Sequence, residues 1–229
     1  MKNVTDQLEE RRQEFSSYLR LLEHLEKRLL RHSEMTRRLG DLPTTDSFKA
    51  MKAAGFLMLY NTIEATIIAA VTELYKEIQG NGCALDQVSK HVQDLWIEQR
   101  FWIAPEEATP KTYRTRAAEM LRETMDGAAL ALTPRRLPIS GNIDAEAVRR
   151  ICSKHGCKLV VHRHARGGAE LDTVKDQRNA LAHGQKTFVE CGQNYAASDI
   201  NRISRECFNF LRGFVRSLEK FIAKAEYRA

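Results

Sequence analysis

The chain has 229 residues, 43% of them apolar, so it is long enough to bury a core and too apolar for a disordered polypeptide. Its 36 Lys and Arg outnumber its 30 Asp and Glu, and the formal net charge of +6 favours partners that carry phosphate. The 12 Gly and 5 Pro are few for an all-β protein, which needs many turns, so we expect an all-α fold.

The cellular location is predicted from charge, apolar length and cysteine count. The opening segment, MKNVTDQLEERRQEF, carries too many charges for a signal peptide. The longest apolar stretch, residues 56–71, is shorter than the ~18–20 residues of a membrane span. Five cysteines are an odd number, which argues against a secreted disulfide framework. We therefore expect a cytoplasmic protein that does not bind membranes.

The N-terminal segment, residues 1–43, has the pattern of one long amphipathic helix. Asp6 and Glu9 have the spacing of a capping box and predict a helix start. Apolar residues then recur every seven positions, at Leu8, Phe15, Leu22 and Leu29. The helix should end near Gly40 and pack on the remaining domain, residues 44–229.

A second helix is predicted from about Asp46 to Gly80. Its middle part, FLMLYNTIEATIIAAV, is apolar almost all the way round, so this helix should be buried on most sides and form the spine of the fold. Further helical patterns follow at about 85–101, 111–126 and 144–155, the last with Asp144 as its N-cap. We interpret residues 100–140 as a helical insertion.

The C-terminal part should contain two more helices. Residues 156–168 are ambiguous, because Lys158 to His162 could form a strand that is too short to support a sheet. A helix should run from about Glu170 to His183, with Gly184 as its C′ residue, and a loop should fill 185–196. Ser198 should cap the last helix. Its inner face is predicted to comprise Ile203, Cys207, Phe210, Phe214, Leu218, Phe221 and Ile222.

The segment VKDQRNALAHG, residues 174–184, carries the most informative group of polar side chains. Asn179 and His183 are four residues apart and therefore share one helix face, and the long side chain of Arg178 can reach the same region. Histidine can act as base or acid near neutral pH, and arginine offers a fixed fork of donors to phosphate. The three residues thus combine a cation, an amide and a titratable ring near a helix end.

This residue set suits the cleavage of RNA without a metal ion. The ribose 2′-hydroxyl must lose a proton, the 5′-oxygen must gain one, and negative charge builds up on the phosphoryl oxygens between them. One histidine cannot easily do both transfers in one step, so a twofold symmetric dimer is expected. The alternative is an ordinary helix C-terminus, where Asn, His and Gly form a cap and cations suit the helix dipole.

The sequence resembles a known superfamily at these residues. Arg178, Asn179 and His183 match the R-x(4–6)-H signature of HEPN domains. The segments FLMLYNTIEATI, SGNIDAEAVRRICSKHGC, LDTVKDQRNALAHG and TFVECGQNYAASDI follow in order and resemble the MAE-type HEPN nucleases. The resemblance covers roughly residues 45–225. The long N-terminal helix and the insertion distinguish the chain from a minimal domain of this type.

The resemblance implies an all-α HEPN-like bundle that forms a homodimer and brings two R-x4-H motifs to one cleft. It also implies a metal-independent endoribonuclease, without a cofactor, that leaves 2′,3′-cyclic phosphate and 5′-hydroxyl ends. Members often act as toxins or effectors in bacterial defence, which implies an antitoxin or another restraining partner. Two alternatives stay open: a non-catalytic helical dimer that binds RNA or protein, and the regulatory subunit of a toxin–antitoxin-like complex.

Three further residues are predicted to support the site. Asn61 and Glu64 are polar positions in the apolar second helix, where a buried carboxylate needs a partner. They could form a satisfied core network, or Glu64 could orient Arg178 across the bundle. Lys175 is the third supporting candidate, and it lies about one helical turn before Arg178 and Asn179.

Two other groups have alternative interpretations. A basic cluster precedes the motif and is either a solvated surface or a wall that guides RNA to the cleft; it comprises Arg149, Arg150, Lys154, Lys158, Arg163 and Arg166. A group of metal-ligand residue types overlaps it: Cys152, His155, Cys157, His162 and His164. Their spacing matches no closed structural zinc site, so we expect no metal there.

Overall fold

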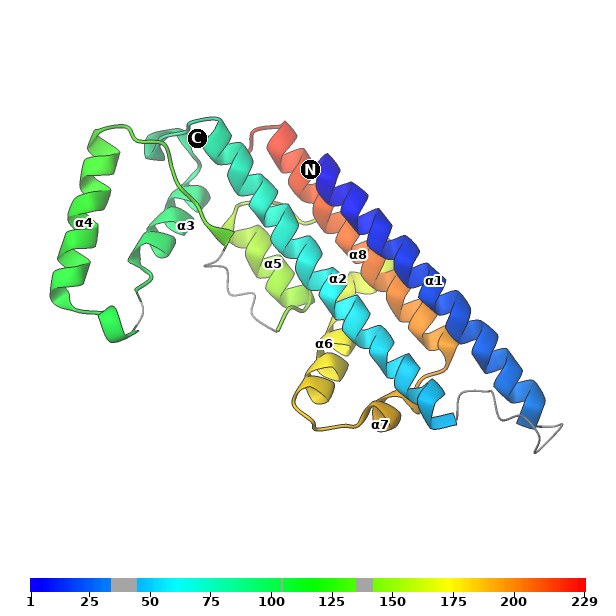
Figure 1. Cartoon of the computed structure of the whole chain (residues 1–229). Helices are drawn as coiled ribbons and strands as arrows, with labels where there is room; N and C mark the ends of the chain where they lie inside the picture. The colour runs from blue at the N-terminus through cyan, green and yellow to red at the C-terminus, as the bar shows by residue number, and fades with distance from the viewer. Residues whose placement is uncertain (34–44, 104, 135–141) are drawn as a thin grey trace.

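Three long helices form the body of the protein in the computed structural model, which describes residues 1–33, 45–103, 105–134 and 142–229. They are α1 (Lys2–Ser33), α2 (Thr45–Gly80) and α8 (Ala197–Ala223). They lie side by side along most of their length, with α1 antiparallel to the other two (Figure 1). The hydrophobic core lies between them.

The apolar periodicity explains the packing of these helices. On α8, the predicted inner face is confirmed, because Ile203, Cys207, Phe210, Phe214, Leu218 and Phe221 are all buried and Ile222 is partly buried. On α1, Leu8, Phe15 and Leu22 are buried and Leu29 packs against the core. Each helix therefore buries the face that its sequence predicts.

The shorter elements follow between α2 and α8 in the chain. They are η1 (Leu85–Gln87), α3 (Lys90–Phe101), η2 (Pro105–Glu107), α4 (Pro110–Met125), α5 (Ala145–Lys154), η4 (Arg163–Gly168), α6 (Ala169–Ala182) and α7 (Phe188–Gly192). Asp144 caps α5 as predicted, because its carboxylate accepts from the amide of Ala147. In the described ranges the β structure amounts to one isolated bridge, Val88 to Arg228, so the all-α prediction is confirmed.

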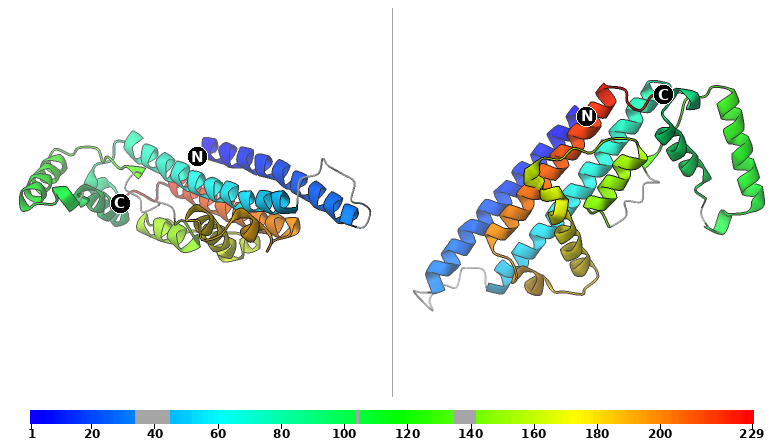
Figure 2. Two further views of the ribbon diagram at one scale, coloured as in Figure 1. Left: turned by 60° about the horizontal axis from the view of Figure 1, so that its bottom comes forward. Right: turned by 180° about the vertical axis from the view of Figure 1, so that it is seen from behind.

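Helices α3 and α4 form an arm at the end of the bundle where both chain termini lie. Figure 2 shows α4 standing away from the three long helices, and α4 packs on α3. The arm includes much of the predicted insertion. Its base is tied to the C-terminus, because the amide of Ser89 donates to the carbonyl of Tyr227 over 2.8 Å.

Two predicted helix starts are wrong. Helix α1 begins at Lys2 instead of near Asp6, and Glu9 contacts Arg12 and Arg212 instead of capping the helix. The predicted end of this helix at Gly40 lies outside the described residues. Helix α8 begins one residue before Ser198, at Ala197.

Side chains other than Ser198 accept hydrogen bonds from the amides at the start of α8. The carboxylate of Asp199 accepts from the amide of Ala196, and Glu26 of α1 accepts from the amide of Ala197. A capping hydroxyl is not needed there, because a carboxylate from a different helix supplies an acceptor. Sequence spacing along one helix cannot reveal such a partner.

The predicted loop 185–196 contains a helix. Thr187 accepts from the amide of Glu190, and the Glu190 carboxylate accepts in return from the amide of Thr187, so α7 begins with a complete capping box. The helix has only five residues and is too short for apolar periodicity to reveal it.

The segment from Lys158 to His162 does not form a strand. Instead it crosses α8, where the amide of Val160 donates to the Ser217 hydroxyl over 2.9 Å. The close approach depends on Gly213, because a Cβ there would lie 2.9 Å from the Val160 carbonyl oxygen. The extended backbone thus binds a helix surface and has no sheet partner.

Helix α2 is the spine of the fold, with contacts to α1, α6, α7 and α8. It is also the one described helix with the length and apolar composition to cross a membrane, yet 56% of that apolar window is buried inside the protein. One stripe of α2 is not covered: Asn61 and Ile68 are exposed and Glu64 is half-buried. The expectation of a buried network that includes Asn61 is therefore wrong.

Candidate active site

Helix α6 presents the Arg-Asn-x3-His motif at its C-terminal end. The helix begins after Gly168, whose φ of +93° and close contacts with Ala145 and Phe210 leave no room for a side chain. It ends at Ala182, and the amide of His183 donates to the Asn179 carbonyl over 3.0 Å. Gly184 has a φ of +66° and is the C′ residue, as predicted.

The side chains of Arg178 and Asn179 are held in a short chain of contacts. The guanidinium of Arg178 donates to the amide oxygen of Asn179 over 2.9 Å. The amide nitrogen of Asn179 donates to the side-chain oxygen of Asn142, also over 2.9 Å. The guanidinium also lies over the ring of Tyr60 on α2, 4.6 Å from its centroid, which is a cation–π contact.

The segment just before α5, with Ile143 and Asp144, contacts both α2 and α6. The amide of Ile143 donates to the Tyr60 hydroxyl over 3.2 Å, so the backbone fixes the ring under Arg178. The Asp144 carboxylate lies 3.0 Å from the ammonium of Lys175 on α6. The N-terminus of α5, the side of α2 and the end of α6 are therefore connected through a few polar contacts.

Charges around the site shift the titration of its groups. Burial alone would raise the pKa of Asp144, but the Ala147 amide and the Lys175 ammonium together lower it below its usual value. The hydrogen bond to Asp144 raises the pKa of Lys175. Burial raises the pKa of Tyr60, so its hydroxyl stays protonated. The site thus holds a fixed positive charge beside a neutral phenol.

His183 is the most accessible member of the motif. Its side chain is exposed, whereas Arg178 and Asn179 are half-buried. In the described part of the chain its ring forms no hydrogen bond or ion pair with another side chain. The imidazole is therefore open to an incoming ligand at the end of the helix that carries Arg178.

The supporting residues predicted from sequence lie around the same site in different roles. Lys175 is engaged with Asp144 and, at 3.7 Å, with Asp176. Glu64 lies one turn after Tyr60 on α2, and its charge raises the pKa of the same hydroxyl that Arg178 and Lys175 lower. Asn61 is exposed on α2.

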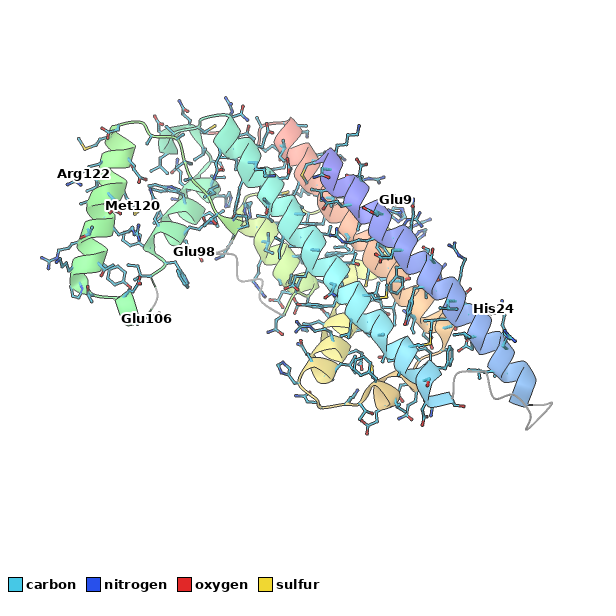
Figure 3. The ribbon with its side chains drawn as sticks, in the orientation of Figure 1. Glu9, His24, Glu98, Glu106, Met120 and Arg122 are labelled. Atoms are coloured by element: carbon cyan, nitrogen blue, oxygen red, sulfur yellow. The ribbon has the colours of Figure 1, made fainter. Side chains whose placement is uncertain are left out.

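The structure divides the predicted basic cluster. Arg149 donates to the Gly167 carbonyl, Arg150 pairs with Glu146, and Arg166 lies 3.6 Å from Glu206. Lys154 pairs with Glu98, which Figure 3 labels. Two members, Lys158 and Arg163, line a separate groove on α8. The cluster is thus divided between residues engaged with nearby acceptors and residues that line the α8 groove.

The five Cys and His residues considered as metal ligands do not form one group in the structure. The ring of His155 is buried and contacts the Ile151 carbonyl and the Tyr75 hydroxyl, whereas His162 and His164 are exposed on the α8 groove. Among the described residues, no group of three or more His, Cys, Asp or Glu side chains is arranged to hold a metal ion.

Sequence reasoning missed Tyr60 and Asn142. Tyr60 belongs to an apolar run, where an aromatic residue is normally a core residue and gives no signal of a polar contact. Asn142 precedes the helix cap Asp144 and has the appearance of a turn residue. Both contacts depend on tertiary packing.

Comparison with known proteins identifies the family. No curated protein matches the chain, and no solved structure does. A family model described as HEPN_MAE_28990/-like HEPN matches residues 1–227, which includes the long N-terminal helix and the arm. The match covers nearly the whole chain and agrees with the all-α bundle. The chain therefore belongs to the MAE_28990-like HEPN family.

Proposed function

We propose that the protein is a metal-independent endoribonuclease whose catalytic residues are Arg178, Asn179 and His183. HEPN domains are commonly ribonucleases, and this chain carries the complete motif. The observation that carries the proposal is the arrangement at the end of α6: a guanidinium held over Tyr60, and an exposed imidazole at the C-cap of the same helix. A purely structural helix cap needs no guanidinium positioned in this way.

Each residue has a role that its surroundings support. His183 takes the proton from the ribose 2′-hydroxyl or gives one to the departing 5′-oxygen. Arg178 donates to the phosphoryl oxygens while charge builds up on them, and it remains charged throughout. Asn179 fixes the guanidinium and in turn is fixed by Asn142. The products are a 2′,3′-cyclic phosphate and a 5′-hydroxyl.

A homodimer would supply the second proton-transfer group. The uncovered stripe of α2 supports this part of the proposal, because Leu57, Met58, Ala65 and Ile68 give it an apolar surface with Asn61 at its centre. Since α6 packs on α2, a twofold axis through this stripe keeps both α6 helices next to the interface. Two copies of His183 could then serve one phosphate.

The proposed biological role is that of a toxin or effector in bacterial defence. An enzyme that cuts cellular RNA harms its own cell, so an antitoxin or another restraining partner belongs to this proposal. Expression in a bacterial strain tests the toxin role. A strain that produces the protein alone should stop growing, and a strain that produces the His183→Ala variant should grow normally.

The activity test is incubation of purified protein with total RNA in EDTA. The wild type should cut, and His183→Ala should lose about 10²–10⁴-fold in rate, the usual contribution of a general acid or base. Arg178→Ala should lose about 10²–10³-fold. His24→Ala is the matched control, because Figure 3 shows His24 on α1, away from α6.

The ends of the fragments identify the reaction. The 5′ ends should accept phosphate from a polynucleotide kinase without prior dephosphorylation. Intact RNA with a folded dimeric protein would reject catalysis and favour the non-catalytic binding function or the regulatory subunit. Cleavage that His183→Ala leaves unchanged would reject the assigned site.

A further inference from the structure

A basic groove runs along α8 on elements that do not carry the catalytic motif. One wall is formed by a row of side chains spaced four residues apart: Arg212, Arg216 and Lys220 of α8, and its C-cap residue Lys224. The other wall is formed by the extended segment that crosses α8, with Lys158 and His162, and by the start of η4, with Arg163 and His164. The groove has a volume of about 850 Å³.

The groove is built by the fold. Gly213 lets the extended backbone approach α8, and the Ser217 hydroxyl binds the amide of Val160. On the extended segment, Lys158, Val160 and His162 are exposed, whereas Leu159 and Val161 pack against the core. This alternation directs the side chains of Lys158 and His162 away from the core.

Most of the positive charge in the groove is not neutralised. The only carboxylate that lines it in the described structure is that of Glu226, which lies 3.6 Å from Lys224. Arg212 reaches Glu9 of α1 at 3.2 Å. Lys158, Arg163, Arg216 and Lys220 are exposed and form no ion pair with any described residue. A surface with this charge attracts polyanions.

The shape of the groove favours a strand over a small anion. The distance along α8 from Arg212 to Lys224 is about 18 Å at the helical rise per residue, and the cations are spread over this length. A small anion would need convergent donors in an enclosed site. The exposed rings that line the groove are those of His162 and His164, whereas Phe221 is buried, so most of the surface offered to a strand is cationic.

We propose that this groove binds the sugar-phosphate backbone of single-stranded RNA, without sequence preference, as a second contact outside the cutting site. The choice of RNA over other polyanions rests on the proposed function. The groove would hold a long transcript while a different part of the strand reaches His183. Arg212, Arg216, Lys220 and Lys224 then belong to substrate binding and do not contact the reacting atoms.

The test measures binding of a labelled 2′-O-methyl RNA strand, which lacks the nucleophilic hydroxyl and cannot be cut by this route. The double variant Arg216→Gln/Lys220→Gln should weaken binding about tenfold at low salt, and the slope of log affinity against log salt should fall by about 1.4, or ~0.7 per lost phosphate contact. Lys158→Gln/Arg163→Gln on the opposite wall should have the same effect, so the result does not depend on the folding of one variant.

The matched control is Lys111→Gln/Arg122→Gln on the α4 arm, with the same loss of charge; Figure 3 labels Arg122 on the outer part of that arm. It should bind as the wild type does. Equal binding by the groove and control variants would overturn the proposal. So would equal competition by polyglutamate and unlabelled RNA, because the groove would then be a general polyanion site.

The two proposals can fail separately. If the protein binds RNA through the groove and cuts none, the groove stands and the ribonuclease assignment falls. If the wild type cuts RNA while the groove variants bind and cut long RNA equally well, the groove proposal falls alone. For an active enzyme, groove variants should raise KM for long RNA and leave kcat unchanged.

Discussion

Arg178 owes its position to contacts from separate parts of the chain. Asn179 orients the guanidinium from the same helix, Tyr60 supports it from α2, and Asn142 fixes Asn179 from the segment before α5. The sequence alone predicts the motif residues, because Arg178, Asn179 and His183 are close in the chain. It cannot predict Tyr60 or Asn142, because their proximity depends on how α2, α5 and α6 pack.

The aromatic ring of Tyr60, more than its hydroxyl, should matter for cleavage. Tyr60→Phe keeps the ring under Arg178 and removes the acceptor of the Ile143 amide, so it should lower stability by about 1 kcal/mol and keep most of the activity. Tyr60→Leu should lose activity as well. Thermal melting and kcat/KM of both variants check this, and equal activity of the two would contradict a supporting role for the ring.

The ion pair between Asp144 and Lys175 should make stability depend on pH. Because the pKa of Asp144 is lowered in the folded protein, its contribution is present above the usual aspartate pKa and is lost as pH falls through the folded value. Asparagine at this position still caps α5 but has no charge. Asp144→Asn should therefore lower the free energy of unfolding by about 0.5–1 kcal/mol at pH 7.

Urea unfolding at several pH values measures this contribution. The difference in unfolding free energy between wild type and Asp144→Asn should shrink as the pH is lowered below the ordinary aspartate pKa of 3.8. A difference that stays constant across this range would show that the pair contributes nothing through its charge.

At the scale of elements, the length of a helix decided whether the sequence could predict it. The long helices α1, α2 and α8 were predictable because many turns of apolar periodicity define a buried face. Helix α7 was not, because five residues carry no such pattern. Helix caps were predictable only where the capping residue is local. Asp144 caps the helix that it precedes, whereas Glu26 reaches the start of α8 from another helix.

Helix α7 packs so closely on α2 that one glycine is required. A Cβ at Gly192 would collide with the carbonyl oxygen of Lys49. Gly192→Ala should therefore destabilise the protein by about 2–3 kcal/mol, the usual cost of overpacking a rigid contact. Chemical denaturation measures it.

Gly80 provides the control for this substitution. It lies at the end of α2, and no neighbouring element comes within 4 Å of the place that a Cβ would occupy, so Gly80→Ala should be neutral or slightly stabilising. If both alanine variants unfold at the same denaturant concentration, the close packing of α7 on α2 is wrong.

At the scale of the whole molecule, the uncovered stripe of α2 distinguishes the fold from a closed bundle. The sequence predicted a helix that is apolar all round and therefore buried, but it could not show which neighbours cover it. In the structure α1, α6, α7 and α8 leave Ile68 exposed, at 41% of its surface. The proposed homodimer would use this free side of α2.

Ile68→Glu should therefore produce a monomer. A charge within an apolar interface remains unpaired on association, and the twofold axis would bury a second like charge in the same interface. Sedimentation should show the loss of dimer, and RNA cleavage should fall with it. Leu121→Glu, at an exposed apolar site on the arm, is the control and should remain dimeric.

The central claim is that the ribose 2′-hydroxyl attacks the phosphate while Arg178 and His183 assist. The most direct measurement compares two labelled RNA strands in EDTA that differ by one 2′-deoxy substitution at the mapped cut position. We predict that the wild type cuts the RNA strand to a 2′,3′-cyclic phosphate and leaves the substituted strand intact at that position. Equal cleavage of both strands there would contradict the claim.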